Sequence, residues 1–200
     1  MTRLQKALIR LDTDLRAGGF RYALVGGFAV TLRAEPRTTR DLDVVLVVSG
    51  DQEAERVALI LRMRGYTDHP KGAAIERSDG RLATIRLISP PVDEDGAGVQ
   101  VDLLVACVGI EPEVVAASQL LEVMPQVYVP VARSGHLVAM KVLAARPQDL
   151  EDIRMLLREM GDADLEIARE SLVLIERRGL LEDSNRSLLA ELERLLGQVA

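Results

Sequence analysis

The sequence feature that most constrains the fold is an acidic pair placed directly before an apolar segment. Asp41 and Asp43 are separated by one residue, and the residues from Val44 to Val48 are all valine or leucine. Such a run is typical of a buried strand and is far shorter than the ~20 apolar residues that cross a bilayer. Side chains alternate along a strand, so the two aspartates share one face while Leu42 points to the other. The sequence therefore predicts a buried strand with a pair of carboxylates at its head.

Composition and charge describe an ordinary globular protein. The 200 residues are 48% hydrophobic and 28% charged, enough for one domain or for a compact domain with a helical appendage. The net charge of −6 argues against a surface built throughout to bind nucleic acid. Charges interrupt the apolar positions of the N-terminal segment, which predicts no signal peptide and a cytoplasmic location. The single cysteine, Cys107, excludes an internal disulfide and a multi-cysteine zinc site, so a bound metal would be held by oxygen.

Hydrophobic periodicity predicts mixed helices and strands over the first two thirds of the chain. Ser49-Gly50-Asp51 offers a helix N-cap, and Pro130 cannot donate to a ladder, which favours a sheet edge for its strand. The expected elements are a helix that ends at Gly18-Gly19, a strand over Phe20–Val25, a helix over Phe28–Glu35, a strand over Asp41–Val48, a helix over Gln52–Arg64, a hairpin over 73–88, and strands over Val99–Val105 and Val127–Val131.

The last third of the sequence is predicted to be helical. Apolar stripes cover residues near 134–145, 148–160, 164–178 and 184–197, separated by Pro147, Gly161 and Gly179. We therefore expect an α+β fold with a mixed sheet and a C-terminal helical bundle. The expected division is an α/β domain over residues 1–132 and a helical domain over 133–200.

A third aspartate can join the acidic pair. In the strand expected over Val99–Val105, Val101 and Leu103 form the core face, and Asp102 projects from the opposite face. If this strand neighbours the first, the three carboxylates converge and can hold Mg²⁺, which prefers hard oxygen ligands. An aspartate at a strand end is also commonly a turn residue or the partner of an arginine. The combination of three is what favours a metal site.

Gly26-Gly27 connects a predicted strand to a predicted helix. Backbone N–H groups at such a turn can cradle a triphosphate, although a tight connection alone also explains two glycines. The order of acids and apolar run separates this pattern from other Asp-x-Asp enzymes. In haloacid-dehalogenase-like phosphotransferases and many glycosyltransferases the acids follow the hydrophobic strand, whereas here they precede it. That order disfavours both families.

Taken together, these residues resemble the nucleotidyltransferase superfamily with the DNA polymerase β-like fold, and within it the minimal bacterial members of the AbiEii toxin type. The resemblance covers most of residues 20–157. It departs from the superfamily's commoner Gly-Ser turn, because Gly27 offers no hydroxyl. The motifs that carry it are Gly26-Gly27, Arg37-x-Thr39-x-Asp41-Leu42-Asp43, Asp102, Lys141 and Arg146-x-x-Asp149-x-x-Asp152.

The resemblance implies Mg²⁺-dependent transfer of a nucleoside monophosphate from an NTP to an acceptor hydroxyl, with release of pyrophosphate. Asp41, Asp43 and Asp102 would be catalytic and would hold the metal, with two ions expected, and Asp102 would help to deprotonate the acceptor. The residues implied in NTP binding are Gly26, Gly27, Arg37, Thr39, Lys141, Asp149 and Asp152.

Several alternatives stay open at the level of sequence. The acceptor can be an RNA 3′ end such as that of tRNA, a protein hydroxyl, or a small molecule such as an aminoglycoside. In the resembling toxins a cognate antitoxin is the partner. Lys141 also fits a lysine that lies along an amphipathic helix, and Asp149 and Asp152 fit a solvated helix face. The same fold can also be a non-catalytic nucleotide-binding or protein-interaction module.

Overall fold

The computed structural model describes the chain except residues 71–74, 79–80, 95, 106–108, 180, 182–185 and 200, so Cys107 lies outside the described residues. Its strands form one mixed sheet in the order β3-β5-β6-β2-β1-β8-β7, with β4 paired to β5. The strands are β1 (Tyr22–Val25), β2 (Asp41–Leu46), β3 (Thr67–Asp68), β4 (Ile75–Ser78), β5 (Arg81–Ile88), β6 (Gln100–Leu104), β7 (Gln119–Met124) and β8 (Val127–Val131).

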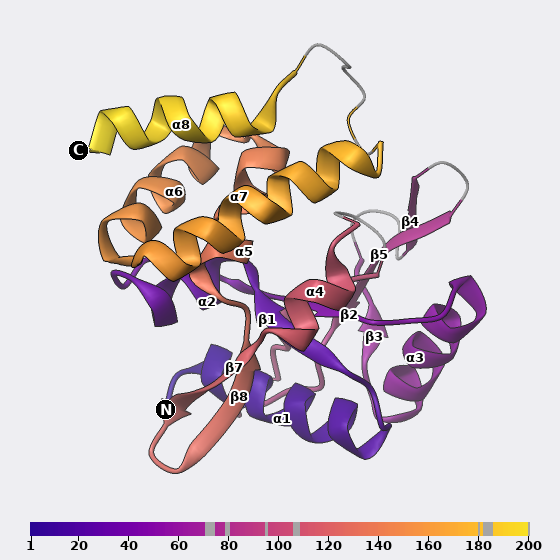
Figure 1. Cartoon of the computed structure of the whole chain (residues 1–200). Helices are drawn as coiled ribbons and strands as arrows, with labels where there is room; N and C mark the ends of the chain where they lie inside the picture. The colour runs from indigo at the N-terminus through magenta and orange to yellow at the C-terminus, as the bar shows by residue number, and fades with distance from the viewer. Residues whose placement is uncertain are drawn as a thin grey trace.

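Helices cover both faces of this sheet. Helices α1 and α3 lie on one side, and α4 lies with the bundle α5–α8 on the other (Figure 1). Among the described residues, none of the helices has the length and apolar character that a membrane crossing requires. The helices are α1 (Arg3–Ala17), α2 (Gly26–Arg33), α3 (Asp51–Met63), α4 (Glu111–Ala116), α5 (Ser134–Ala144), α6 (Pro147–Glu159), α7 (Asp162–Arg177) and α8 (Leu188–Val199).

The N-terminal helices begin and end for local reasons. Helix α1 starts in a capping box between Thr2 and Gln5 and ends at Gly18, as predicted. The expected start of the next helix at Phe28 was wrong, because α2 begins at Gly26. Gly26 adopts a φ of 64°, which lets the chain turn from β1 directly into the helix.

The expected cap of the third helix was also only partly right. Gly50 is the N-cap residue of α3, and it makes no side-chain cap hydrogen bond. Instead, the backbone N–H and the hydroxyl of Ser49 donate to Glu53 Oε2 at 2.6 and 2.7 Å. The carboxylate of Glu53, in the first turn, therefore ties the entering chain to this helix.

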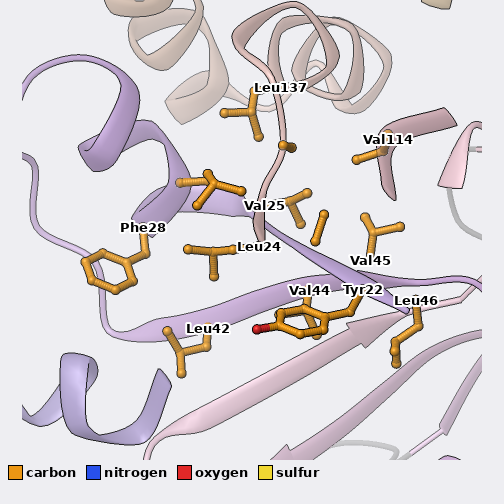
Figure 2. Packing of buried hydrophobic residues seen from close by; sticks show 14 of the residues in the cluster. Tyr22, Leu24, Val25, Phe28, Leu42, Val44, Val45, Leu46, Val114 and Leu137 are labelled. Carbon is orange, nitrogen blue, oxygen red and sulfur yellow. The ribbon is translucent and has the colours of Figure 1, made fainter. Parts of the chain in front are cut away.

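Strand β2 is the centre of the sheet and carries the predicted apolar run. It is antiparallel to β1 and parallel to β6. Leu42 and Val44 are fully buried, and Val45 is buried beside Val114 of α4 (Figure 2). Above the sheet, Leu137 of α5 adds to the same apolar core. The strand is therefore held by packing on both faces, with its aspartates at the starting end.

Two expectations about the strands need comment. The expectation that Val127–Val131 is an edge strand was wrong, because β8 lies between β1 and β7, and β7 is the edge. The ladder between β1 and β8 pairs only Leu24 with Val131, one residue beyond Pro130, so the missing N–H interrupts little. The hairpin over 73–88 is confirmed where it is described, since Ser78 pairs with Arg81.

The C-terminal helices agree with the prediction. Helix α8 starts at Leu188, and the expected start at 184 lies outside the described residues. The apolar core runs without interruption from the sheet into α5 and α6. The division of the chain at residues 132 and 133 stays a prediction. Helices α5 and α6 stand over the sheet (Figure 1). Residues of both helices line one cavity together with Asp41, Asp43 and Asp102.

Candidate active site

Three aspartates lie on one face of two neighbouring strands. In the parallel ladder between β2 and β6, Asp43 is directly paired with Asp102, and Asp41 is two residues before Asp43. Alternation puts all three side chains on the same face. They line a single cavity of about 530 Å³ between the sheet and α5. The shared face that the sequence predicted is confirmed, and the condition that the two strands are neighbours is met.

The negative charge in this cavity is only partly balanced. The pKa of Asp43 is raised to about 7, first by burial and then by the charges of Asp41 and Asp102. The charges of Lys141 and Arg146 act in the opposite direction without cancelling this effect. A cation bound among the carboxylates would remove the repulsion.

Asp102 is held by hydrogen bonds from the neighbouring strand β5 and from its own strand β6. Arg86 of β5 donates from Nε to Oδ1 at 2.9 Å and from Nη2 to Oδ2 at 3.2 Å. Nε2 of Gln100 lies 3.2 Å from each carboxylate oxygen. Asp41 accepts a hydrogen bond of 3.1 Å from the hydroxyl of Thr39. Arg86 and Gln100 therefore fix the carboxylate of Asp102, and Thr39 fixes that of Asp41.

The donor set suits a hard cation. Asp41, Asp43 and Asp102 offer only oxygen atoms, the ligands that Mg²⁺ prefers. Within the described residues, no three acidic, histidine or cysteine side chains are already gathered at metal-binding distances around one point. A metal ion at Asp102 would have to share the oxygens that accept from Arg86 and Gln100. The chemistry of these oxygen donors fits Mg²⁺.

The glycine turn is pressed against these acids. A Cβ built on Gly26 would lie 1.9 Å from Oδ2 of Asp43, and its φ of 64° already disfavours any other residue. Gly26 and Gly27 line the same cavity as the aspartates. The turn opens α2, whose first backbone N–H groups have no partner inside the helix. A phosphate beside the carboxylates would therefore meet N–H donors.

A second group of charged residues lies over the cavity, where α5 ends and α6 begins. We call Lys141, Arg146, Asp149 and Asp152 the ion network. Lys141 is buried; its Nζ lies 3.1 Å from Oδ1 of Asp149 and also donates to Asp152. Arg146 donates from Nε to Asp149 at 2.7 Å, and Nε of Arg37 lies 3.1 Å from Oδ1 of Asp152. The alternatives of a surface lysine and a solvated acidic helix face are therefore wrong, because Asp149 and Asp152 are almost completely buried.

Charge pairing governs the ionisation of this network. Burial works to raise the pKa of Asp149, but the hydrogen bond from Arg146 and the charge of Lys141 outweigh it and hold the pKa below its usual range. The pKa of Arg146 is raised, chiefly by its hydrogen bond to Asp149. The pKa of Asp149 is therefore shifted in the opposite direction to that of Asp43.

Most, but not all, of the residues predicted for the site reach the cavity. Thr39, Asp149 and Asp152 do not line it; Thr39 contacts Asp41, and the other two lie behind Lys141. Sequence reasoning missed the lining residues Thr84, Arg86, Gln100 and Gln148. The sequence signal for Arg86 was the alternation along its strand, but only the cross-strand register pairs it with Asp102. The predicted residues that line the cavity are Gly26, Gly27, Arg37, Asp41, Asp43, Asp102 and Lys141.

A mixed sheet that aligns three aspartates beside a glycine turn is the arrangement of a nucleotidyltransferase. The family model described as nucleotidyl transferase AbiEii toxin, of type IV toxin–antitoxin systems, matches residues 11–197. The chain therefore belongs to the AbiEii nucleotidyltransferase toxin family, and the resemblance seen in the sequence is confirmed. No curated protein sequence matches the chain.

Solved structures of nucleotidyltransferases share the fold. An antigenic nucleotidyltransferase-like protein from Paracoccidioides brasiliensis is 17% identical, with a TM-score of 0.53 over 96% of this chain and 92% of that one. ANT(2″)-Ia in complex with adenylyl-2″-tobramycin is 14% identical, with a TM-score of 0.55 over 88% and 99% of the two chains. MenT4, a nucleotidyltransferase toxin from Mycobacterium tuberculosis H37Rv, is 18% identical, with a TM-score of 0.51 over 94% and 74%. At these identities the similarity shows the fold alone.

Proposed function

We propose that this nucleotidyltransferase transfers a nucleoside monophosphate from an NTP to an acceptor hydroxyl and depends on Mg²⁺ held by Asp41, Asp43 and Asp102. The observation that carries the proposal is the register of β2 and β6, which pairs Asp43 with Asp102 in a cavity that the Gly26-Gly27 turn also lines. Two ions are expected, because two-metal sites stabilise both the attacking and the leaving oxygen of a phosphoryl transfer.

In this mechanism each residue around the cavity has a separate role in the transfer. Mg²⁺ held by Asp41, Asp43 and Asp102 would neutralise phosphate charge and would make the acceptor hydroxyl more acidic. Asp102 accepts the proton of that hydroxyl, whose oxygen forms a bond to the α-phosphorus. The bond from the α-phosphorus to the bridging oxygen breaks, and pyrophosphate leaves with the electron pair. Thr39 orients Asp41 through its hydroxyl, and Arg86 orients Asp102.

The triphosphate is bound opposite the acceptor. The Gly26-Gly27 turn offers backbone N–H groups, and Arg37 and Lys141 offer positive charge on the same side of the cavity. Asp149 and Asp152 act through Lys141, because they hold its ammonium group and do not line the cavity. These two aspartates are positioning residues in the proposal.

The charges around the cavity favour a neutral or anionic acceptor. ANT(2″)-Ia was solved with an adenylylated tobramycin, which is a polycation. In the described part of this chain, the only acids that line the cavity are the three that would hold metal, and four basic residues accompany them: Arg37, Arg86, Lys141 and Arg146. A polycation would find no uncommitted carboxylate there. An RNA 3′ end or a protein hydroxyl therefore suits the site better than an aminoglycoside.

The family adds a biological role to the proposal. AbiEii proteins are the toxins of type IV toxin–antitoxin systems, and the structurally similar MenT4 is also described as a toxin. We therefore propose that acceptor modification by this chain is toxic and that a cognate antitoxin is its partner.

Labelling separates these possibilities. The purified chain is incubated with Mg²⁺ and each α-labelled NTP, together with total RNA, protein lysate or tobramycin. We expect label on RNA or protein, none with EDTA, and a rate at least about a hundredfold lower in Asp43→Ala. The exposed Asp162→Ala is the matched control and should behave as the wild type.

Other outcomes contradict parts of the proposal. Transfer that survives in Asp43→Ala would overturn the assignment of the site, and label on tobramycin alone would overturn the acceptor class. NTP binding measured by calorimetry without transfer to any acceptor would support the non-catalytic binding module instead.

A further inference from the structure

The space beside Gly27 is filled by an arginine. A Cβ built on Gly27 would lie 2.3 Å from Nη2 and 3.1 Å from Cζ of Arg37, and 2.8 Å from Oγ1 of Thr39. Real Cβ atoms essentially never approach another atom closer than 3.0 Å. Unlike Gly26, Gly27 is not among the glycines with positive φ. Glycine is therefore needed at position 27 for space and not for backbone conformation.

The guanidinium of Arg37 has donors to spare. Its side chain lines the cavity beside the glycine turn and is 28% exposed. Nε is buried and lies 3.1 Å from Oδ1 of Asp152, but the angle makes no hydrogen bond. No hydrogen bond among the described residues comes from this guanidinium. A charged planar group with unused N–H donors next to a turn of bare backbone matches the geometry of a phosphate oxyanion.

Asp152 links this arginine to the lysine of the ion network. Its Oδ1 faces Arg37, and its Oδ2 accepts from Lys141. A single buried carboxylate therefore sets the positions of two cations that line the cavity. Arg37 lies against Gly27, and Lys141 shares Asp152 with it, so both cations lie near the glycine turn.

We propose that Arg37 takes the place of a side chain at position 27 as the phosphate-binding group of the turn, and that Gly27 is required to leave it room. The inference rests on the proposed function, since it needs an NTP in this cavity. A Gly-Ser turn would offer one hydroxyl, whereas the guanidinium offers a charge and several donors. Position 27 and Arg37 are then mutually exclusive: a side chain at 27 expels the guanidinium.

The fold can tolerate the substitutions that test this idea. Two side-chain atoms, Nη2 of Arg37 and Oγ1 of Thr39, lie closer than 3.0 Å to a Cβ at position 27, and the nearer, Nη2, is the end of a long and partly exposed side chain that can move without moving the backbone. Arg37→Ala removes the same group directly. Arg21→Ala is the matched control, because Arg21 is exposed and precedes β1 at the end opposite Gly26.

The test is a double-mutant cycle on NTP affinity. Calorimetry measures the Kd of a non-hydrolysable NTP in Mg²⁺ for the wild type, Arg37→Ala, Gly27→Ala, the double variant and Arg21→Ala. We expect about ten- to a hundredfold weaker binding in each single variant at positions 37 and 27. The double variant should bind the NTP at least as tightly as whichever single variant has the higher Kd, because Gly27→Ala has already expelled the guanidinium. Arg21→Ala should bind as the wild type does.

Each other result has a defined meaning. Losses that multiply in the double variant would show independent roles, and an unchanged Kd in either single variant would also overturn the proposal. If Gly27→Ala does not fold, Arg37→Ala alone decides, because it removes the guanidinium without adding a side chain at position 27, and an unchanged Kd in that variant overturns the proposal. A wild-type chain that binds no NTP contradicts the proposed function itself and is thereby distinguished from these outcomes.

Discussion

On the sheet, Asp41, Asp43 and Asp102 face one cavity, and their mutual repulsion helps to raise the pKa of Asp43 to about 7. On the helices that stand over it, Asp149 and Asp152 are more deeply buried, yet they share Lys141, and the pKa of Asp149 is held low. Both regions place aspartates in poorly hydrated surroundings. They differ in whether the protein itself supplies the counter-charge.

That difference distinguishes the candidate active site on the sheet from the ion network that positions Lys141 beside it. In the ion network each buried acid has a cation, which fixes the position of Lys141 at the cavity wall. On the sheet, Arg86 balances Asp102, but the described neighbours leave Asp43 with surplus negative charge. Such an excess of negative charge lowers the stability of the fold unless a ligand brings positive charge. Functional sites are commonly less stable in this way, because their charges are arranged for the ligand. The comparison can be tested by removing charges from each region in turn.

The largest effect is expected when the ion network loses its lysine. Lys141→Met leaves two buried carboxylates without their shared cation and should lower the free energy of unfolding by about 3–5 kcal/mol. Urea denaturation measures this loss, and a fall of about 10 °C in Tm should accompany it. The control is Lys6→Met, which breaks a partly exposed pair with Asp93 and should cost less than about 1 kcal/mol. Equal losses in the two variants would mean that the network is not buried in solution.

A smaller effect of the opposite sign is expected on the sheet. The pKa of Asp43 is raised from 3.8 to about 7, so the folded chain binds its proton more tightly than the unfolded chain does. Stability contributed by this group is therefore lost as pH rises from about 4 to about 7, and the penalty is complete above that range. Asp43→Asn cannot ionise and should be more stable than the wild type at pH 8 by about 1–3 kcal/mol.

The same variant should lose its response to metal. Urea denaturation in EDTA at pH 8 and pH 4 gives the comparison, and most of the gain should be gone at pH 4, where Asp43 of the folded wild type is protonated. Added Mg²⁺ should stabilise the wild type and leave Asp43→Asn unchanged. The exposed Asp162→Asn serves as the control with no gain at either pH. A variant that is less stable than the wild type at both pH values would show that Asp43 is not under electrostatic strain.

The sheet part of the site was accessible to sequence reasoning because strand alternation is a local property. The spacing of Asp41 and Asp43 fixes a shared face, and the apolar residues around Asp102 fix its face in the same way. That β2 and β6 are neighbours in the right register was a conditional expectation, and Arg86 could not be found at all. Pairing between strands depends on contacts distant in the chain, which periodicity does not report.

The helical part was harder for a related reason. In the sequence, the apolar residues around Lys141 suggest an amphipathic helix that leaves the lysine at the surface. Helix α5 is instead buried around most of its circumference, so the charge of Lys141 is buried too. The partners Asp149 and Asp152 lie on α6, and only the packing of the two helices turns them toward the lysine. The edge position expected for β8 failed similarly, since Pro130 reports on one missing N–H and not on which strand lies beside it.

The smallest expected effect is that of a second substitution in the ion network. It measures how much the burial of a charge pair contributes to the free energy of unfolding. Arg146 donates to Asp149 at 2.7 Å, a shorter contact than that of Lys141, but its side chain is 61% exposed. Water and Lys141 can replace much of what it provides, so Arg146→Ala should lower the free energy of unfolding by less than about 1 kcal/mol. Urea denaturation beside Lys141→Met makes the comparison, because both substitutions remove a cation from the same carboxylate. A loss as large as that of Lys141→Met would mean that charge pairing alone, and not burial of the pair, distinguishes the network from the carboxylates on the sheet.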